Sequence, residues 1–213
     1  MMKMKVLGII CSPRKEGNTE ILIKECMKGS SSEGAENELV FLRDKNINPC
    51  DGCGSCKKTH ECHIDDDMQP IYEKLLEADG IIIGTPVYFW DMCGQAKVFL
   101  DRTYALRYPN HRLMNKVGGA IAVAGRTGAM RVLNNLYTFF IRGHHMFVSD
   151  VCTGLASDKG EIRKDKRAMV MAFEIGKQVV QLIKKDLEYP ESYNKAIYDL
   201  IQEKYEAPRY PVG

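Results

Sequence analysis

The sequence contains no apolar run that approaches the length needed to cross a bilayer, and no block of charge of one sign. Its net charge is only +2, from 30 Lys and Arg against 28 Asp and Glu. Because basic and acidic residues alternate, as in Lys15-Glu16, we expect neither a nucleic-acid nor a membrane partner. The apolar run from Val6 to Cys11 is too short for the core of a secretion signal. We therefore expect a cytoplasmic protein.

Internal repeats, low-complexity tracts and domain linkers are also absent from the sequence. Its 213 residues suit one compact domain, which we assign to residues 1–186. Residues 187–213 are rich in Tyr and Pro, and we assign them to a C-terminal tail, with an oligomer interface as its expected place. Disulfides are rare in the cytoplasm, so the eight cysteines are interpreted as thiols or metal ligands.

Short apolar runs alternate with longer segments of helical periodicity. The runs that predict strands are 5–10, 38–42, 80–84, 118–124 and 146–151, and the predicted helices are 18–28, from 67 onward, 93–105, 129–141 and 161–186. Five nearly continuous apolar strands separated by helices favour an α/β fold whose doubly wound parallel sheet is covered on both faces. In such a sheet, ligands bind at the carboxyl ends of the strands, near the change in strand order.

The loop after the first strand has the chemistry of a phosphate site, although the sequence lacks both a Walker A loop and a G-x-G-x-x-G fingerprint. Hydroxyls, backbone N–H groups and a helix N-terminus together bind phosphate, and an arginine adds a charge-assisted contact. The residues that we assign to this site are Ser12, Arg14, Gly17, Asn18 and Thr19. The alternative is a plain capped loop in which Asn18 or Thr19 is the helix cap.

Two further loops are expected at the same edge of the sheet. The loop after the third strand is apolar and aromatic, as a flat flavin ring requires of its walls; it consists of Pro86, Val87, Tyr88, Phe89 and Trp90. Taken alone, this loop suits a core or an interface equally well. After the fourth strand, Gly125 and Arg126 allow the backbone to approach a ligand closely, although many such loops are only turns.

Four of the eight cysteines lie within 13 residues, in the loop 44–66 that follows the second strand. Cys50, Cys53, Cys56 and Cys62 form the pattern C-x2-C-x2-C-x5-C, with small residues between the first three. This spacing favours one iron–sulfur cluster, since structural zinc sites usually combine two separated C-x2-C pairs. Zinc and metal-free thiols stay open as alternatives. We expect His60 and His63 to be solvated rather than to bind metal.

Several motifs resemble those of the NADPH-dependent FMN reductase family, and the cysteine run resembles its iron–sulfur flavoprotein branch, found in methanogenic archaea and anaerobic bacteria. The motifs are Ser12-Pro13-Arg14, Gly17-Asn18-Thr19, Thr85-Pro86-Val87-Tyr88-Phe89-Trp90, Gly94-Gln95-Ala96-Lys97, Phe99-Leu100-Asp101-Arg102 and Asp65-Asp66-Asp67-Met68. The resemblance covers roughly residues 4–155. It implies a flavodoxin-like fold, FMN, one [4Fe–4S] cluster, and a homodimer or homotetramer in which the cluster of one subunit lies near the flavin of another.

The resemblance also implies that ferredoxin-like one-electron donors are coupled to two-electron flavin chemistry. Two alternatives remain at this stage. One is an NAD(P)H-dependent FMN or quinone reductase whose cysteines bind zinc or no metal. The other is a pure electron carrier without a substrate pocket. No acid–base residue pair is expected, because the cofactors carry the chemistry.

Overall fold

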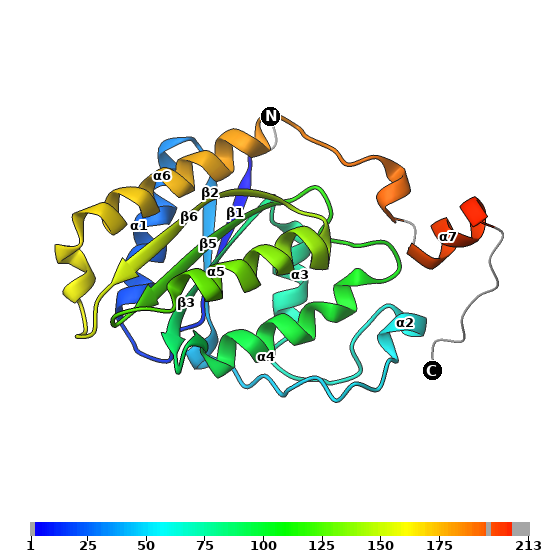
Figure 1. Cartoon of the computed structure of the whole chain (residues 1–213), viewed down its shortest axis with the longest axis horizontal. Coiled ribbons are helices and arrows are strands. Elements are labelled where there is room, and N and C mark those ends of the chain that lie inside the picture. The colour runs from blue at the N-terminus through cyan, green and yellow to red at the C-terminus, as the bar shows by residue number, and fades with distance from the viewer. Residues whose placement is uncertain (1–2, 195–196, 206–213) are drawn as a thin grey trace.

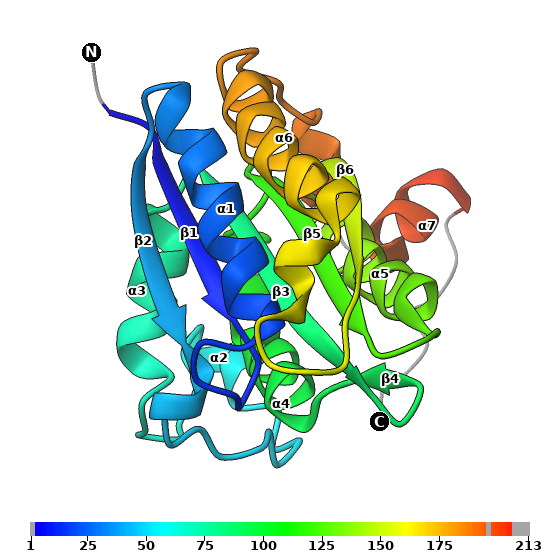
Figure 2. The ribbon, with the colours of Figure 1, turned by 90° about the vertical axis from the view of Figure 1, so that its left-hand side faces the viewer.

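A six-stranded sheet forms the centre of the molecule in the computed structural model, which describes residues 3–194 and 197–205. Its order is β2-β1-β3-β5-β6, all parallel, and the short β4 pairs antiparallel with β3 beyond this path. The strands are β1 (Lys5–Ile10), β2 (Glu36–Phe41), β3 (Gly80–Tyr88), β4 (Asp91–Met92), β5 (Val117–Ala124) and β6 (Phe147–Leu155). The strand order changes direction between β1 and β3, and β2 is an edge strand (Figure 2). The predicted five-stranded, doubly wound parallel sheet is confirmed.

Helices cover both faces of the sheet (Figures 1 and 2). One face packs against α1 (Asn18–Ser32) and α6 (Lys166–Ile183), and the other packs against α3 (Gln69–Glu77), α4 (Gly94–Arg102) and α5 (Ala129–Tyr137). Successive strand residues therefore enter different cores: Ile81 and Ile83 face α3–α5, whereas Ile82 faces α1 and α6. Because both faces of the inner strands are covered, β1, β3 and β5 are nearly continuous apolar runs, whereas the edge strands β2 and β6 also carry exposed polar residues.

The helices α1 and α6 touch backbone to backbone at Gly29 and Gly176. A Cβ atom at Gly29 would lie 1.9 Å from the Phe173 carbonyl oxygen, and one at Gly176 would lie 1.9 Å from the Cys26 carbonyl oxygen. Any larger residue at either position would separate the two helices. The pair therefore fixes how closely α1 and α6 pack.

The predicted helices differ from the observed ones mainly at their ends. Residues 161–186 form a 3-10 turn (Glu161–Lys164) followed by α6, because the Asp165 carboxylate accepts the N–H of Ala168 and starts a new helix. The predicted helix 93–105 ends in a 3-10 turn (Thr103–Arg107), and 129–141 ends in a π-helix (Thr138–Gly143). A 3-10 turn (Leu42–Asp44) follows β2, and the short helix α2 (Cys56–Thr59) lies within the cysteine loop.

The tail begins on the amino-end side of the sheet. The Tyr189 ring stacks on Phe147 at 4.4 Å between centroids, and its N–H donates to Asn115 at 2.9 Å. A 3-10 turn (Glu191–Asn194) and α7 (Ile197–Tyr205) follow, helices that the sequence pattern did not predict. Residues 195–196 and 206–213 of the predicted tail lie outside the described residues. None of the described helices is long and apolar enough to cross a membrane.

Candidate functional site

A pocket of about 270 Å³ lies at the carboxyl ends of the strands, at β1 and β3, between which the strand order changes direction. It brings together most of the residues predicted for flavin binding: Ser12, Arg14, Asn18, Thr19, Pro86, Val87, Tyr88 and Gly125. This is the position at which a doubly wound sheet binds its ligand. The three predicted loops therefore share one site.

The N-terminus of α1 supplies the anion-binding groups of this pocket. Within the described part of the chain, the N–H groups of Asn18, Thr19 and Glu20 have no acceptor, and the first helical bond comes from Ile21 to the Gly17 carbonyl. Unpaired N–H groups and the helix dipole favour a bound anion at this end. A phosphate group fits these donors.

Ser12 and Arg14 shape the opening of the pocket. The Ser12 Oγ accepts the N–H of Arg14 at 3.2 Å, so its own proton is free to point toward a ligand. The Arg14 guanidinium donates from Nη1 to the carbonyl of Ser157 at 3.2 Å, across the loop that follows β6. Arg14 is thereby held at the pocket, and among the described residues it has no acidic partner, so its charge is available to a phosphate group.

Asn18 has a different role from the predicted cap. Helix α1 is capped by Gly17 without a side-chain bond, so the expectation that Asn18 or Thr19 caps the helix is wrong. The Asn18 side chain instead donates to the Asp158 carbonyl at 2.8 Å and accepts the N–H of Ile162 at 3.3 Å. Its amide therefore braces the loop after β6, and its backbone N–H is the group that faces the pocket.

Glu20 stabilises the loop between β1 and α1. Its carboxylate is buried, accepts the N–H of Glu16 at 2.7 Å, and pairs with Lys24 at 2.7 Å and Arg43 at 2.8 Å. Burial raises the pKa of Glu20, but these hydrogen bonds outweigh burial and lower the pKa overall. A charged Glu20 thus fixes the loop that begins α1.

Four predicted flavin residues do not line this pocket. Gly17 is the cap of α1, and Arg126 is exposed beside the pocket. The side chains of Phe89 and Trp90 are 98% and 60% exposed, with left-handed φ angles of 47° and 72°. These two aromatics form the turn between β3 and β4, and they present an apolar surface to the outside.

The pocket also contains residues that sequence reasoning missed: Val123, Ala156 and Ser157. The fifth predicted strand ended at residue 151, whereas β6 continues to Leu155. This strand lies at the sheet edge, so polar residues interrupt its apolar run. The register of its pairing with β5 also shifts between Gly118 and Ala120. A full-length strand would have placed residues 156 and 157 at the predicted edge.

A second pocket, of about 160 Å³, is lined by all four predicted cluster ligands, Cys50, Cys53, Cys56 and Cys62. Cys50 and Cys53 are exposed, whereas Cys56 and Cys62 are half-buried. Burial raises the pKa of the Cys56 thiol, and the nearby Cys62, Cys53 and Cys50 raise it further. Four thiols around one pocket form a donor set that suits an iron–sulfur cluster, so the residues present fit this group.

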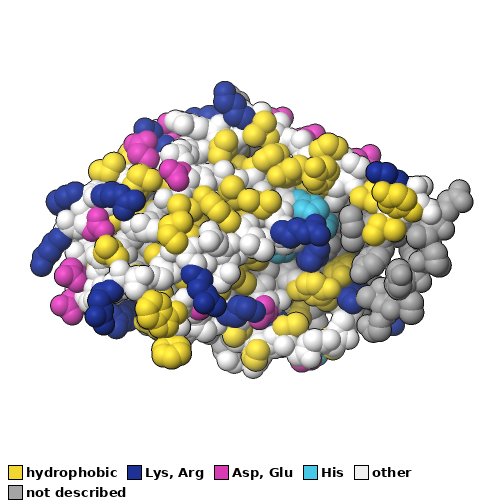
Figure 3. Space-filling model, viewed as in Figure 1, with side chains coloured by type: hydrophobic (Ala, Val, Ile, Leu, Met, Phe, Trp, Pro, Cys, Tyr) yellow, Lys and Arg dark blue, Asp and Glu magenta, His cyan; other side chains and the backbone are white. Residues whose placement is uncertain are grey.

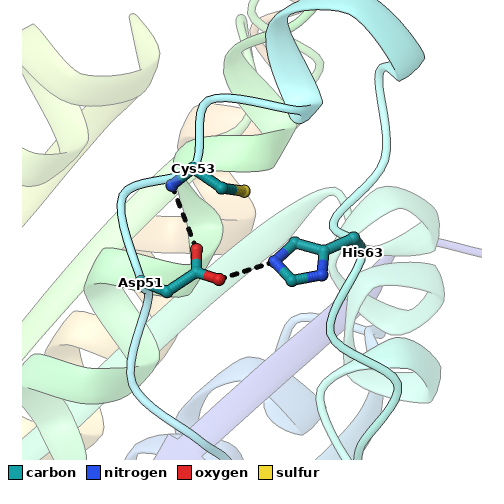
Figure 4. A group of neighbouring side chains, drawn as sticks. All are labelled: Asp51, Cys53 and His63. Carbon is teal, nitrogen blue, oxygen red and sulfur yellow. Dashed lines mark hydrogen bonds and ion pairs between the residues drawn. The ribbon is translucent and has the colours of Figure 1, made fainter.

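The rim of the cysteine pocket carries a polar cluster that includes His63, which was expected to be merely solvated. Figure 4 shows Asp51 between two partners: it accepts the N–H of Cys53 at 3.1 Å and binds the His63 Nε2 at 2.8 Å. These contacts, first of all the bond from Cys53, lower the pKa of Asp51 to about 2. Asp51 thus turns the backbone between the first two cysteines.

A buried ion pair attaches the cysteine loop to the end of α4. Arg102 donates from Nη1 to Asp66 Oδ2 at 2.6 Å and from Nη2 to Oδ1 at 3.1 Å. Asp66 also accepts the N–H groups of Asn48 and Met68. Burial raises the pKa of Asp66, but Arg102 and these N–H groups hold it at about 2. The guanidinium further donates to the carbonyls of Asn48 and Ile64, so both arms of the loop are fixed.

The two pockets lie at opposite ends of α4. This helix begins at Gly94, just after β4 at the flavin side, and its last residues, Asp101 and Arg102, line the cysteine pocket. Figure 1 shows the chain after β2 running alongside α4 as far as α2. Nine helical residues span about 13 Å. The start of α4 thus follows β4, which pairs with Val87 of the strand-end pocket, whereas its end lies at the cysteine pocket.

Residues 4–159 match the family described as NADPH-dependent FMN reductase. The chain belongs to this family. An iron-sulfur flavoprotein of Methanocaldococcus jannaschii is 40% identical over 190 residues, which cover 85% of this chain and 98% of the relative. An iron-sulfur flavoprotein of Archaeoglobus fulgidus is 32% identical, covering 84% of this chain and 95% of the relative. Within the NADPH-dependent FMN reductase family, the chain thus lies in the iron–sulfur flavoprotein branch and is a flavin-dependent oxidoreductase.

A solved structure supports the fold of this NADPH-dependent FMN reductase family member. RosB with bound 8-demethyl-8-formylriboflavin-5'-phosphate superimposes with a TM-score of 0.79, at 20% identity, covering 98% of this chain and 92% of RosB. At this identity the likeness shows the fold alone. The flavodoxin-like architecture predicted from the motifs is confirmed.

Proposed function

We propose that the protein binds FMN in the pocket at the carboxyl ends of the strands and one [4Fe–4S] cluster on Cys50, Cys53, Cys56 and Cys62. When bound, the two cofactors convert between one-electron and two-electron transfer. A ferredoxin-like protein is the proposed electron donor. The observation that carries this proposal is the single pocket lined by all four cysteines, in a chain that already has a flavin-type pocket.

The residues of the flavin pocket have separate tasks in this proposal. The N–H groups of α1, Ser12, Arg14 and Thr19 hold the phosphate. Pro86, Val87 and Tyr88 form the wall against which the ring lies, and Gly125 lets the chain after β5 come close to it. The phosphate group thus anchors the ligand, while apolar walls exclude water from the ring.

The separation of the two pockets supports an oligomer in which electrons cross between subunits. Within one chain, the two pockets share no lining residue, and they lie toward opposite ends of α4. Phe89 and Trp90 present exposed aromatic surface beside the flavin pocket, of the kind that subunit interfaces bury. Figure 3 shows further hydrophobic side chains spread among basic ones over the α5 and α6 side. We propose a homodimer or homotetramer whose tail, residues 187–213, contributes to contacts between subunits.

One rival function has a specific observation in its favour. Asp51, Cys53 and His63 bring three ligand atoms within 4.8 Å of one another, a donor set that zinc also accepts. In that case the protein is an NAD(P)H-dependent FMN or quinone reductase, and the cysteine loop is a structural zinc site. We place the protein in the cytoplasm in both cases, because all eight cysteines are unpaired.

The deciding experiment measures metal and flavin in anaerobically purified protein. The wild type is expected to contain about four iron atoms and sulfide per chain, and FMN. Cys53→Ala is expected to lose the iron while FMN stays bound, because Cys53 lies outside the flavin pocket. Cys152→Ala, a matched change of a buried thiol far from the loop, is expected to retain both. Zinc in place of iron, or full iron content in Cys53→Ala, contradicts the proposal.

A further inference from the structure

One hydrogen-bond donor of Arg102 has no acceptor among the described residues. Its guanidinium carries five N–H groups. Two on Nη1 reach the Asn48 carbonyl and Asp66 Oδ2, and two on Nη2 reach the Ile64 carbonyl and Asp66 Oδ1. The fifth, on Nε, is buried and has no partner among the described residues.

The residue that carries this unpaired donor lies at the cysteine pocket. Arg102 is 1% exposed and is one of the residues that line the pocket, next to the four thiols. Burial lowers the pKa of the Arg102 guanidinium, and the Asp66 bond, then the nearby Tyr72 and then Cys62 raise it. Buried donors on charged groups nearly always have an acceptor. Among the described residues the Nε–H has no acceptor; the nearby Tyr72 hydroxyl donates its own proton to the Arg102 carbonyl at 2.8 Å. Sulfur is the acceptor that a loaded pocket adds.

We propose that the Nε–H of Arg102 donates a hydrogen bond to a sulfur of the bound cluster, either a bridging sulfide or the Cys62 thiolate. This inference rests on the proposed function, because it requires a cluster on the four cysteines. N–H bonds to sulfur stabilise the more negative, reduced form of a cluster. Arg102 therefore raises the reduction potential, so that the cluster accepts one electron from its donor more readily, with no proton or bond exchanged.

The neighbouring groups explain why an arginine is needed. Asp66 neutralises the guanidinium and uses only its Nη donors, so the Nε–H is the part of Arg102 left for the cluster. A lysine has a single charged nitrogen at the end of its chain and no donor at the Nε position. Arg102→Lys thus keeps a cation for Asp66 and removes the donor to sulfur.

The test is a redox titration of the cluster, followed by electron paramagnetic resonance of the reduced state. Arg102→Lys is expected to retain iron and sulfide and to shift the midpoint potential to lower values. Arg112→Lys is the matched control: Arg112 donates to the His60 carbonyl of the same loop at 3.4 Å, but it does not line the pocket. Its potential is expected to stay at the wild-type value. An unchanged potential in Arg102→Lys overturns the inference.

A measurement on the wild type keeps the inference testable if Arg102→Lys fails to assemble the cluster. Protein labelled with ¹⁵N at the arginine Nε is reduced, and electron–nuclear double resonance is recorded. Arg102 is the one arginine among the described residues lining the pocket, so a ¹⁵N coupling to the cluster is the expected result. Absence of the coupling overturns the inference. Wild-type protein without iron and sulfide contradicts the proposed function itself, which is a separate outcome.

Discussion

Arg102 and Asp66 form a bidentate ion pair, at 2.6 and 3.1 Å, in which both side chains are almost closed to solvent. The pair joins the end of α4 to the segment that follows the cysteines. Removal of one member of a buried pair leaves an uncompensated charge, which commonly costs about 3–5 kcal/mol. This contact is therefore the main structural tie of the cysteine loop.

Asp66→Asn is expected to lower the free energy of unfolding by about 3 kcal/mol, because Arg102 loses its counter-charge in a buried position. Denaturant unfolding of matched, equally loaded samples measures this change. Asp65→Asn, at the exposed neighbouring carboxylate, is expected to change the same quantity by less than about 0.5 kcal/mol. Equal effects of the two substitutions would show that the ion pair does not hold the loop.

Replacement of Arg14 and Thr19 together by Ala is expected to weaken FMN binding at least tenfold, or roughly 1.4 kcal/mol. Both residues line the flavin pocket, and Arg14 brings the only arginine charge among its lining residues in the described chain. Fluorescence titration of apoprotein with FMN measures the affinity. Lys15→Ala, an exposed neighbour outside the pocket, is the control and should bind FMN normally. Unchanged affinity in the double variant contradicts the phosphate assignment.

The flavin released from the protein by heat is expected to be FMN rather than FAD. The pocket offers one helix N-terminus for phosphate, that of α1, and the sequence has no dinucleotide fingerprint. Mass spectrometry of the released cofactor identifies it directly. Stoichiometric FAD would require a second nucleotide site and would refute this expectation.

Electron transfer from a donor that enters at the cluster is expected to slow when the oligomer is diluted to monomers with both cofactors retained. The reason is that the two pockets of one chain share no lining residue and lie toward opposite ends of α4. Stopped-flow absorbance of flavin reduction, with subunit mass followed in parallel, provides the measurement. Monomers that reduce their flavin as fast as the oligomer would place the electron route within one subunit.

The free energy of unfolding is expected to decrease as the pH is lowered below about 6.5, because of His144. Burial, and then the nearby Arg107, lower the pKa of His144 to about 3. Between pH 6.5 and 3 the unfolded chain binds a proton at this histidine and the folded chain does not. The stabilisation is thus fully present above pH 6.5 and falls by about 1.4 kcal/mol per pH unit below it.

Unfolding free energies at pH 7 and pH 5 test this expectation. His144→Gln is expected to reduce the difference between the two values by about 2 kcal/mol. Gln can keep the contact that His144 makes with the Thr103 hydroxyl at 3.1 Å. His60→Gln, at an exposed histidine, should leave the difference unchanged. A pH profile of His144→Gln identical to that of the wild type contradicts the assignment.

The sequence was sufficient to predict the sheet and its ligand edge, because buried parallel strands are recognisable as apolar runs. The sequence was less informative where a residue of one element binds a segment that is distant in the sequence. Asn18 has the composition of a helix cap, but its amide binds the loop after β6, a contact 140 residues away. The end of β6 was missed because polar residues at a sheet edge resemble a loop. Long-range contacts of this kind leave no local pattern.

The cysteine loop shows the same limit. Four cysteines were predicted from their spacing to bind one cluster, and they line one pocket; that they are ligands stays a prediction. The motifs Asp65-Asp66-Asp67-Met68 and Phe99-Leu100-Asp101-Arg102 were noticed separately, as parts of a resemblance. Nothing in either motif indicates that Asp66 and Arg102 bind each other, because 36 positions separate them. Pairing of buried charges depends on packing, which spacing does not encode.

The close packing of α1 and α6 at Gly29 and Gly176 has a consequence for ligand binding. Helix α1 presents its N-terminal donors to the phosphate, and its middle is pressed directly against α6 by these two glycines. Close backbone packing of this kind opposes sliding and rolling of α1, so we expect little ordering of this helix to accompany binding. In the proposed complex with FMN, the phosphate donors are therefore preorganised, which lowers the entropy cost of binding.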